Sequence, residues 1–227
     1  MKKLLIASAL SAVFASPTVF AQAKNFEGFG LQLSTGYQNN QLKFSDFKAD
    51  GTPLSQFGYS VPTISSGEMP LNIGAGYTFV LSDRFTLGAL VEYNPLSMNT
   101  GSSNFVVPAG VTSSAYSGKL ENQVSLSLVP GYAFNGTTMG YARVGWINAT
   151  AKATSGDGLS FSTNTNGVIF GLGAKHLFTK SIYGFAEATY ATYGGSNDTV
   201  TSAIGQSVAA NVTPESYSFL IGVGYKF

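Results

Sequence analysis

The chain has 227 residues, of which only 10% are charged, 13% are aromatic and 27 are glycine. A soluble domain normally has about 25% charged residues, so this chain has too little charge to cover a water-exposed surface. A hydrophobic content of 44% with a net charge of +1 excludes a disordered chain. The near-neutral charge also gives no electrostatic reason to expect nucleic acid as a partner. Because cysteine is absent, disulfides, thiolate metal sites and cysteine nucleophiles are excluded.

The first 21 residues have the composition of a secretory signal peptide. Lys2 and Lys3 precede a short apolar run, and small residues follow that run. A positive start, an apolar middle and a small-residue end are typical of a cleaved export signal. Serines and a proline interrupt the run, which argues against a transmembrane anchor of about 20 apolar residues. We predict cleavage after Ala21, with Ala23 as the alternative, and a mature domain over residues 22–227.

Eight segments alternate large apolar residues with small or polar ones. Side chains of a β-strand point alternately to opposite faces, so a period of two predicts strands with one apolar face. A closed bacterial membrane barrel needs an even number of strands, and eight satisfies that condition. The predicted strands cover residues 30–37, 71–79, 85–93, 123–134, 138–149, 166–178, 182–193 and 215–227.

The connections between these strands alternate between short and long. Outer-membrane barrels have short turns in the periplasm and long loops outside, with both termini inside. We therefore predict an all-β fold, an eight-stranded antiparallel transmembrane β-barrel with four long extracellular loops and three short periplasmic turns. Pro130 predicts a bulge inside the fourth strand, and Pro95 predicts the end of the third. The short connections are residues 81–84, 135–137 and 179–181, and the long polar ones are about 40–66, 95–119, 150–165 and 194–214.

The two faces of the predicted strands differ in size. The polar face is rich in glycine, and an eight-stranded barrel has an interior just wide enough for side chains, so small inward residues leave room for a few large ones. The large apolar face then meets lipid, whereas a soluble barrel would have charges there. Aromatic residues near both ends of the strands predict two interfacial girdles. They are Phe79, Phe85, Phe134, Phe178, Tyr225 and Phe227 near the short turns, and Tyr37, Tyr93, Tyr190 and Tyr193 near the long loops.

Four charged residues, Glu92, Arg143, Lys175 and Glu187, fall in the middle of predicted strands at similar heights. Glu92 and Lys175 belong to the polar face. Arg143 and Glu187 lie on strands with weaker alternation, and we assign them inward because a basic residue on the lipid face near the midplane costs about 2–4 kcal/mol. Buried charges persist only when paired and hydrogen-bonded. We predict an interior ion-pair network that fills the lumen, in preference to a gated path for protons or ions.

No catalytic constellation emerges from the sequence. His176 is the only histidine, and it falls on the apolar face of the sixth strand near a short turn. A Ser-His-Asp site or a metal cage would have to use this outward residue. We therefore expect no catalytic residues, no metal ligands and no cofactor, and we predict that the protein is not an enzyme.

The mature chain resembles the small outer-membrane barrels of the OmpA-like, OmpX-like or opacity-protein-like porin family. The resemblance rests on the signal peptide, the eight strands with four long loops, and the terminal strand. Tyr225 and Phe227 are similar to the signal that the outer-membrane assembly machinery reads in that family. The segment 140–146 is similar to the fifth strand of such barrels, where an inward arginine meets inward acids. The resemblance implies a bacterial outer-membrane location, with lipid and the barrel assembly machinery as partners.

The sequence leaves two functions open. The first is a structural or surface-interaction role such as adhesion, in which a plugged barrel presents its loops to host or surface ligands. The second is a small diffusion pore for ions or small solutes, which a glycine-rich interior permits and the four charges oppose.

Overall fold

The structure is a computed structural model that describes residues 22–49, 52–53, 63–104, 115–155, 160–194, 196–201 and 207–227. The predicted signal peptide, residues 1–21 with the cleavage residue Ala21, lies outside the described residues.

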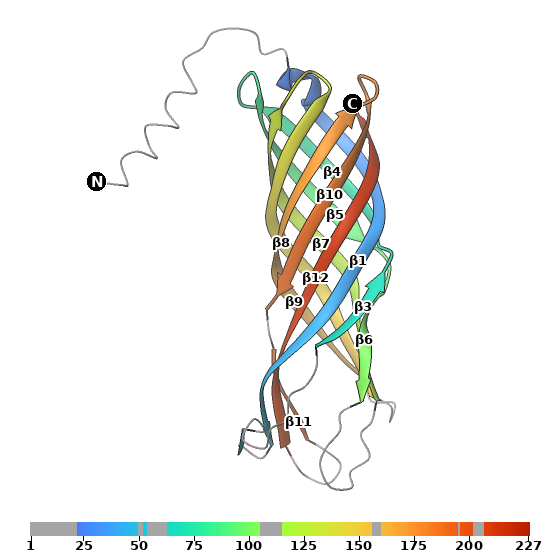
Figure 1. The fold of residues 1–227 in the computed structure, drawn as a ribbon, viewed down its shortest axis with the longest axis vertical. Coiled ribbons are helices and arrows are strands. Elements are labelled where there is room, and N and C mark those ends of the chain that lie inside the picture. The colour runs from blue at the N-terminus through green and yellow to red at the C-terminus, as the bar shows by residue number, and fades with distance from the viewer. Residues whose placement is uncertain are drawn as a thin grey trace, which may run out of the picture.

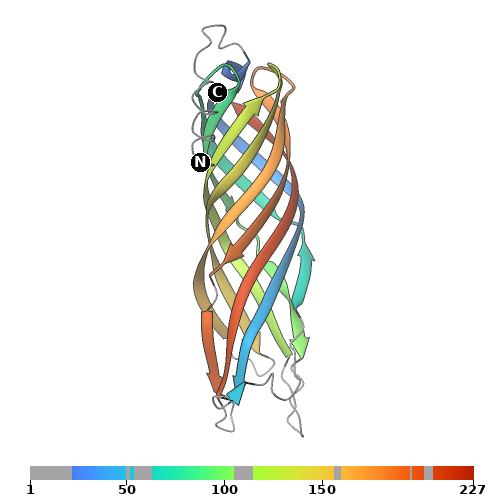
Figure 2. The same ribbon diagram turned by 60° about the vertical axis from the view of Figure 1, so that its left-hand side comes forward.

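Eight long antiparallel strands form a closed barrel (Figures 1 and 2). All eight predicted strands are therefore confirmed. The last strand pairs with the first as well as with the strand before it, which closes the sheet. In their order around the barrel, the strands are β1 (Gly28–Ala49), β4 (Leu71–Val80), β5 (Phe85–Asn94), β7 (Ala115–Ala133), β8 (Thr138–Ser155), β9 (Ser160–Leu177), β10 (Ile182–Tyr193) and β12 (Ser207–Lys226).

The segments predicted as long loops are in large part strands. Five barrel strands continue into them, and short strands pair with these extensions: β2 (Thr52–Pro53) and β3 (Ile64–Glu68) with β1, β6 (Met98–Asn104) with β7, and β11 (Ser196–Thr201) with β12. Both faces of such extensions can meet water, so their Ser-, Thr- and Asn-rich sequences lack the apolar alternation on which the prediction depended. Each extension continues the hydrogen-bonded pairing that its strand already has with the neighbouring strand, and this pairing keeps it extended.

The barrel has two distinct ends. The connections 81–84, 135–137 and 179–181 lie at the same end as the C-terminus, and we call this the turn end (Figure 1). A short 3-10 helix, η2 (Ala23–Phe26), lies at the turn end before β1. The opposite end, toward which β6 and β11 point, is the loop end. Strand β5 stops at Asn94, directly before Pro95, as predicted.

Pro130 does not produce the bulge that we predicted. It faces Leu87 of β5 in an unbroken register, and the register between β7 and β8 is the same before and after it. Strands β7 and β8 are not paired at Pro130 itself. The proline nitrogen, which has no hydrogen to donate, therefore replaces no hydrogen bond of the sheet. The irregularity of β7 lies instead beside Asn122, whose φ of 52° accompanies a register shift.

The outer surface of the barrel is a continuous apolar belt, as the alternation predicts. Trp146, the only tryptophan, lies in it with 47% of its surface exposed. Aromatic pairs occur toward both edges of the belt, such as Tyr225 with Phe227 and Tyr190 with Tyr217. Tyr193 is an exception to the predicted girdle, because the odd residues of β10 face inward and it is buried. Other exposed belt residues include Leu31, Leu33, Ile73, Phe79, Val91, Leu126, Leu128, Val144, Phe170, Leu172, Phe219, Ile221 and Val223.

Inward glycines make room for inward aromatic rings. A Cβ atom at Gly224 would collide with the ring of Tyr183, and one at Gly222 would collide with Phe185. The interior of an eight-stranded barrel leaves little spare volume, so each large inward ring needs a small residue beside it. The glycine-rich face is therefore the inside of the barrel.

Candidate functional site

The lumen is filled in layers, and the layer at the turn end is apolar. Side chains from η2 and from four strands, β7 to β10, meet there in one buried cluster. Ala23 is fully buried and Phe26 is 3% exposed, so helix η2 contributes to the interior of the barrel. The cluster consists of Ala23, Phe26, Ala133, Met139, Tyr141, Leu177, Tyr183 and Phe185, with Val80 and Val129 packed against it.

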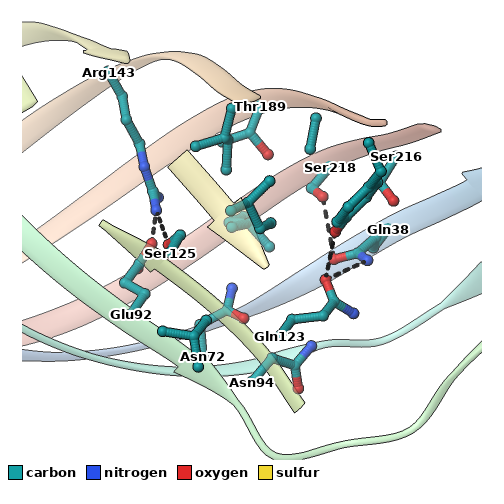
Figure 3. A pocket seen from close by; sticks show the side chains of 16 residues that line it. Gln38, Asn72, Glu92, Asn94, Gln123, Ser125, Arg143, Thr189, Ser216 and Ser218 are labelled. Carbon is teal, nitrogen blue, oxygen red and sulfur yellow. Dashed lines mark hydrogen bonds and ion pairs between the residues drawn. The ribbon is translucent and has the colours of Figure 1, made fainter. Parts of the chain in front are cut away.

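A buried charged layer lies next along the lumen, centred on Arg143. Its guanidinium forms ion pairs with Glu92 of β5 and with Glu187 of β10, the latter at 2.9 Å between Nη1 and Oε1. The same group donates hydrogen bonds to Ser127 Oγ at 3.0 Å and to Ser125 Oγ at 2.8 Å. Figure 3 shows Arg143 pointing across the lumen toward Glu92 and Ser125. All three charged side chains are less than 10% exposed.

Strand β9 lies between β8 and β10, and its glycines allow Arg143 to reach Glu187. Gly171 is directly opposite Arg143, and Gly173 is directly opposite Glu187. Neither glycine carries a side chain that could block the path from β8 to β10. The two serines of β7 and Gln32 of β1, whose Nε2 donates to Glu92 Oε1 at 3.1 Å, complete the layer. We did not predict these three polar residues as part of it, although their inward position was available from the alternation.

Lys175 does not join the ion pairs that we predicted for it. Among the described residues it has no carboxylate within 4.0 Å, and its Nζ lies 4.3 Å from the ring centroid of Tyr183. In the β9–β10 register, Lys175 is opposite Phe185, two residues closer to the turn end than the Gly173–Glu187 pair. This offset places Lys175 beside the apolar cluster at the turn end. There its ammonium group lies over the Tyr183 ring, whose negative face stabilises a cation.

A small polar cavity of about 40 Å³ separates the charged layer from the loop end. Gln38, Gln123 and Ser218 project into it from β1, β7 and β12 (Figure 3). Ser218 Oγ donates to Gln38 Oε1 at 3.3 Å, whereas Gln123 Nε2 and Asn94 Nδ2 have no partner among the described residues. A cavity of this size has room for only a few water molecules.

A second apolar cluster lies beyond the cavity, toward the loop end. It draws on β6 to β10, and its largest fully buried members are Met98 and Leu120. The polar cavity therefore lies between the charged layer and an apolar layer. The members are Met98, Leu120, Ile147, Ala149, Ile169, Ala191 and Tyr193.

The other residues singled out from the sequence lie on the outside. His176 is exposed, with its Nδ1 3.0 Å from Thr138 Oγ1. Tyr225 and Phe227 are exposed at the turn end with ring centroids 4.9 Å apart, and the backbone N–H of Phe227 donates to Phe29 O at 2.9 Å. The described ranges contain no group of His, Cys, Asp and Glu residues that could hold a metal ion. No helix within them is long and apolar enough to cross a membrane.

Comparison with solved structures finds proteins of low sequence identity. They include Ail of Yersinia pestis in complex with the heparin analogue sucrose octasulfate (17% identity, 88% of this chain and 99% of that chain, TM-score 0.45). Neisserial surface protein A is 14% identical over 88% of this chain and 97% of its own, with a TM-score of 0.49. OprG of Pseudomonas aeruginosa is 14% identical over 92% and 99%, with a TM-score of 0.45. No curated protein sequence matches the chain.

A protein-family model, described as the outer membrane protein beta-barrel domain, matches residues 5–227. The match covers nearly the whole chain and agrees with the closed barrel and its apolar belt. The protein is therefore a bacterial outer-membrane barrel that belongs to the outer membrane protein beta-barrel domain family.

Proposed function

We propose that this barrel is closed to solutes and acts at the cell surface through its loop end, with a structural or surface-interaction role and no catalytic one. In this proposal the turn end faces the periplasm, as in other outer-membrane barrels. The observation that carries the proposal is the filling of the lumen, in which a charged layer lies between two apolar clusters.

The charged layer is the centre of the proposed plug. Arg143 is 3% exposed, and its guanidinium has four partners, two carboxylates and two hydroxyl groups. A buried guanidinium that lost these partners would carry an uncompensated charge, which costs several kcal/mol. Opening a path along β8 therefore requires new partners for Arg143, and a passing solute would have to supply them.

The strand extensions at the loop end support the surface role. Two ion pairs stabilise them on the outside, Lys43 with Glu215 at 2.7 Å and Lys152 with Glu121 at 2.6 Å. Strands β1 and β12 remain paired as far as Ala49 and Val208. The ribbon so formed extends beyond the rest of the barrel at the loop end (Figure 1). A paired ribbon presents a binding surface to a ligand with less loss of entropy than a free loop would.

The alternative function is a small diffusion pore. The cavity favours it, because Gln38, Gln123 and Ser218 provide hydrogen-bonding groups inside the barrel. The cavity measures only about 40 Å³ and lies between filled layers, so a pore would need rearrangement of the charged layer.

Single-channel conductance of the refolded protein in a planar bilayer tests the proposal. We expect no steady openings from the wild-type chain. The same preparation must show the heat-shifted gel mobility of a folded barrel, so that the absence of current is not due to unfolded protein. Arg143→Ala should raise the frequency of brief openings above the wild-type level, because it removes the side chain that bridges β5 and β10 while the two apolar clusters remain in place. Lys43→Ala is the matched control, since it removes a basic residue on the outside of the barrel. Steady wild-type openings would overturn the plug and favour the pore.

The surface role has a separate test. Deletion of residues 52–66 should reduce binding of expressing cells to a host-cell or abiotic surface, while the folded barrel still shows heat-shifted mobility. Unchanged binding would contradict a role for this segment, whatever the conductance.

A further inference from the structure

The first residues after the predicted signal peptide are part of the barrel interior at the turn end. Ala23 has no exposed surface, and Phe26 is 3% exposed. Both belong to the apolar cluster that includes Tyr141, Tyr183 and Phe185, which come from β8 and β10. Helix η2 therefore does more than lead into β1, because its side chains occupy the mouth of the lumen.

Three separate parts of the barrel hold this segment in place. The backbone N–H of Ala23 donates to Asp83 O at 3.0 Å, in the β4–β5 turn. The side chain of Asn25 donates from Nδ2 to Gly136 O at 2.8 Å, in the β7–β8 turn. Lys226 of β12 donates from Nζ to the backbone oxygen of Glu27 at 3.2 Å. The anchors come from widely spaced strands, so the segment spans the mouth.

An ion pair within the segment stabilises its single helical turn. Lys24 Nζ contacts the carboxylate of Glu27, three residues further on. The hydrogen bond to Glu27, and then the attraction of its charge, raise the pKa of Lys24 above its usual value. Charged residues thus face water on the outside of the segment while Ala23 and Phe26 face the lumen.

We propose that residues 22–27 form a cork that closes the turn end, and that export processing cuts the chain after Ala21 to leave the cork intact. Hydrolysis of the Ala21–Gln22 peptide bond consumes one water molecule, leaving a carboxylate on Ala21 and a free α-amino group on Gln22. The alternative cut after Ala23 would remove a fully buried residue and its hydrogen bond to the β4–β5 turn.

The cork deepens the proposed plug, because it adds a seal at one mouth to the charged layer in the middle. The inference rests on the closed lumen of the proposed function. Labelling at the turn end tests the cork alone, whereas conductance tests the whole lumen. If the labelling showed an open turn end while the wild-type protein still gave no conductance, this inference would be refuted and the charged layer would remain as the plug.

Intact mass of the protein extracted from outer membranes identifies the cut. We expect a chain that starts at Gln22, with or without loss of ammonia from cyclisation of that residue. A mass that corresponds to a start at Lys24 would overturn the processing site and remove Ala23 from the cork.

Cysteine labelling tests the seal, and the absence of native cysteines makes it clean. Ala133 has no exposed surface and lies in the cluster that the cork covers, so Ala133→Cys should react slowly with a water-soluble maleimide in the folded, detergent-solubilised mature protein. Adding Phe26→Ala should raise the labelling rate by about tenfold or more, because residues 22–27 would then move away from the mouth more often and expose residue 133. Lys180→Cys, in an exposed turn, should label rapidly in both backgrounds.

Two results would overturn the cork. Rapid labelling of Ala133→Cys in the otherwise wild-type chain would mean that the mouth is open. An unchanged slow rate with Phe26→Ala would mean that another element closes it. If Phe26→Ala lost the heat-shifted mobility of the folded barrel, Asn25→Ala would replace it, because that change removes one anchor at the surface and should give a smaller rise in rate.

Discussion

Replacing Arg143 with alanine should destabilise the barrel by about 3–5 kcal/mol, the usual cost of removing one partner from a buried ion pair. The residue is 3% exposed, and its loss leaves Glu92 and Glu187 close together without their ion-pair partner. Ser125 and Ser127 also lose their donor. With an m-value of roughly 2 kcal/mol per molar urea, the unfolding midpoint should fall by about 2 M.

Urea unfolding in lipid vesicles, followed by tryptophan fluorescence, measures this shift. Trp146 is the only tryptophan and lies in the outer apolar belt, so its emission reports departure from the lipid. Gel mobility without heating provides a second probe, and agreement between the two supports a two-state transition.

Two further variants separate the causes of the loss. The triple variant Glu92→Gln/Arg143→Met/Glu187→Gln removes all three charges, so it should recover most of the stability. Lys152→Ala breaks the Lys152–Glu121 ion pair, whose side chains are 46% and 24% exposed, and should change the free energy of unfolding by less than about 1 kcal/mol. A midpoint for Arg143→Ala within about 0.3 M urea of the wild type would refute the ion-pair network. A triple variant as unstable as Arg143→Ala would attribute the loss to packing instead of uncompensated charge.

Three further predictions concern the barrel wall. Gly224→Val should cost about 1–3 kcal/mol in the same urea assay, because the new side chain collides with the Tyr183 ring, and no loss would contradict the packed lumen. Val144→Arg should cost about 2–4 kcal/mol in lipid vesicles, since Val144 is 46% exposed on the belt; a neutral effect would place this residue away from the membrane midplane. Deletion of Phe227 should lower the amount of folded protein in the outer membrane of cells while refolding of the purified chain proceeds. Equal impairment of both would argue against an assembly signal.

The period of two was sufficient to predict the barrel, because the direction of a side chain from a strand depends only on local backbone geometry. It placed Glu92 and Lys175 on the inward face without further help. The inward placement of Arg143 and Glu187 needed one added argument, the cost of a charge in lipid, and both side chains are buried inside the barrel. Local alternation was weaker where the polar extensions of β1, β7, β8, β9 and β12 leave the apolar belt, and there the strands continue further than we predicted.

The contacts inside the lumen could not be read from that periodicity, because they depend on how far each strand is shifted against its neighbours. A shift of two residues along β9 separates Lys175, which lies over Tyr183, from the height at which Arg143 reaches Glu187. The same applies to helix η2, whose contacts with Asp83 and Gly136 exist only after the sheet has closed. The sequence by itself determined the strands and which of their faces is apolar, since both are local properties. The tertiary structure decided which charges meet and what fills the mouth, since both depend on the register of strands far apart in the chain.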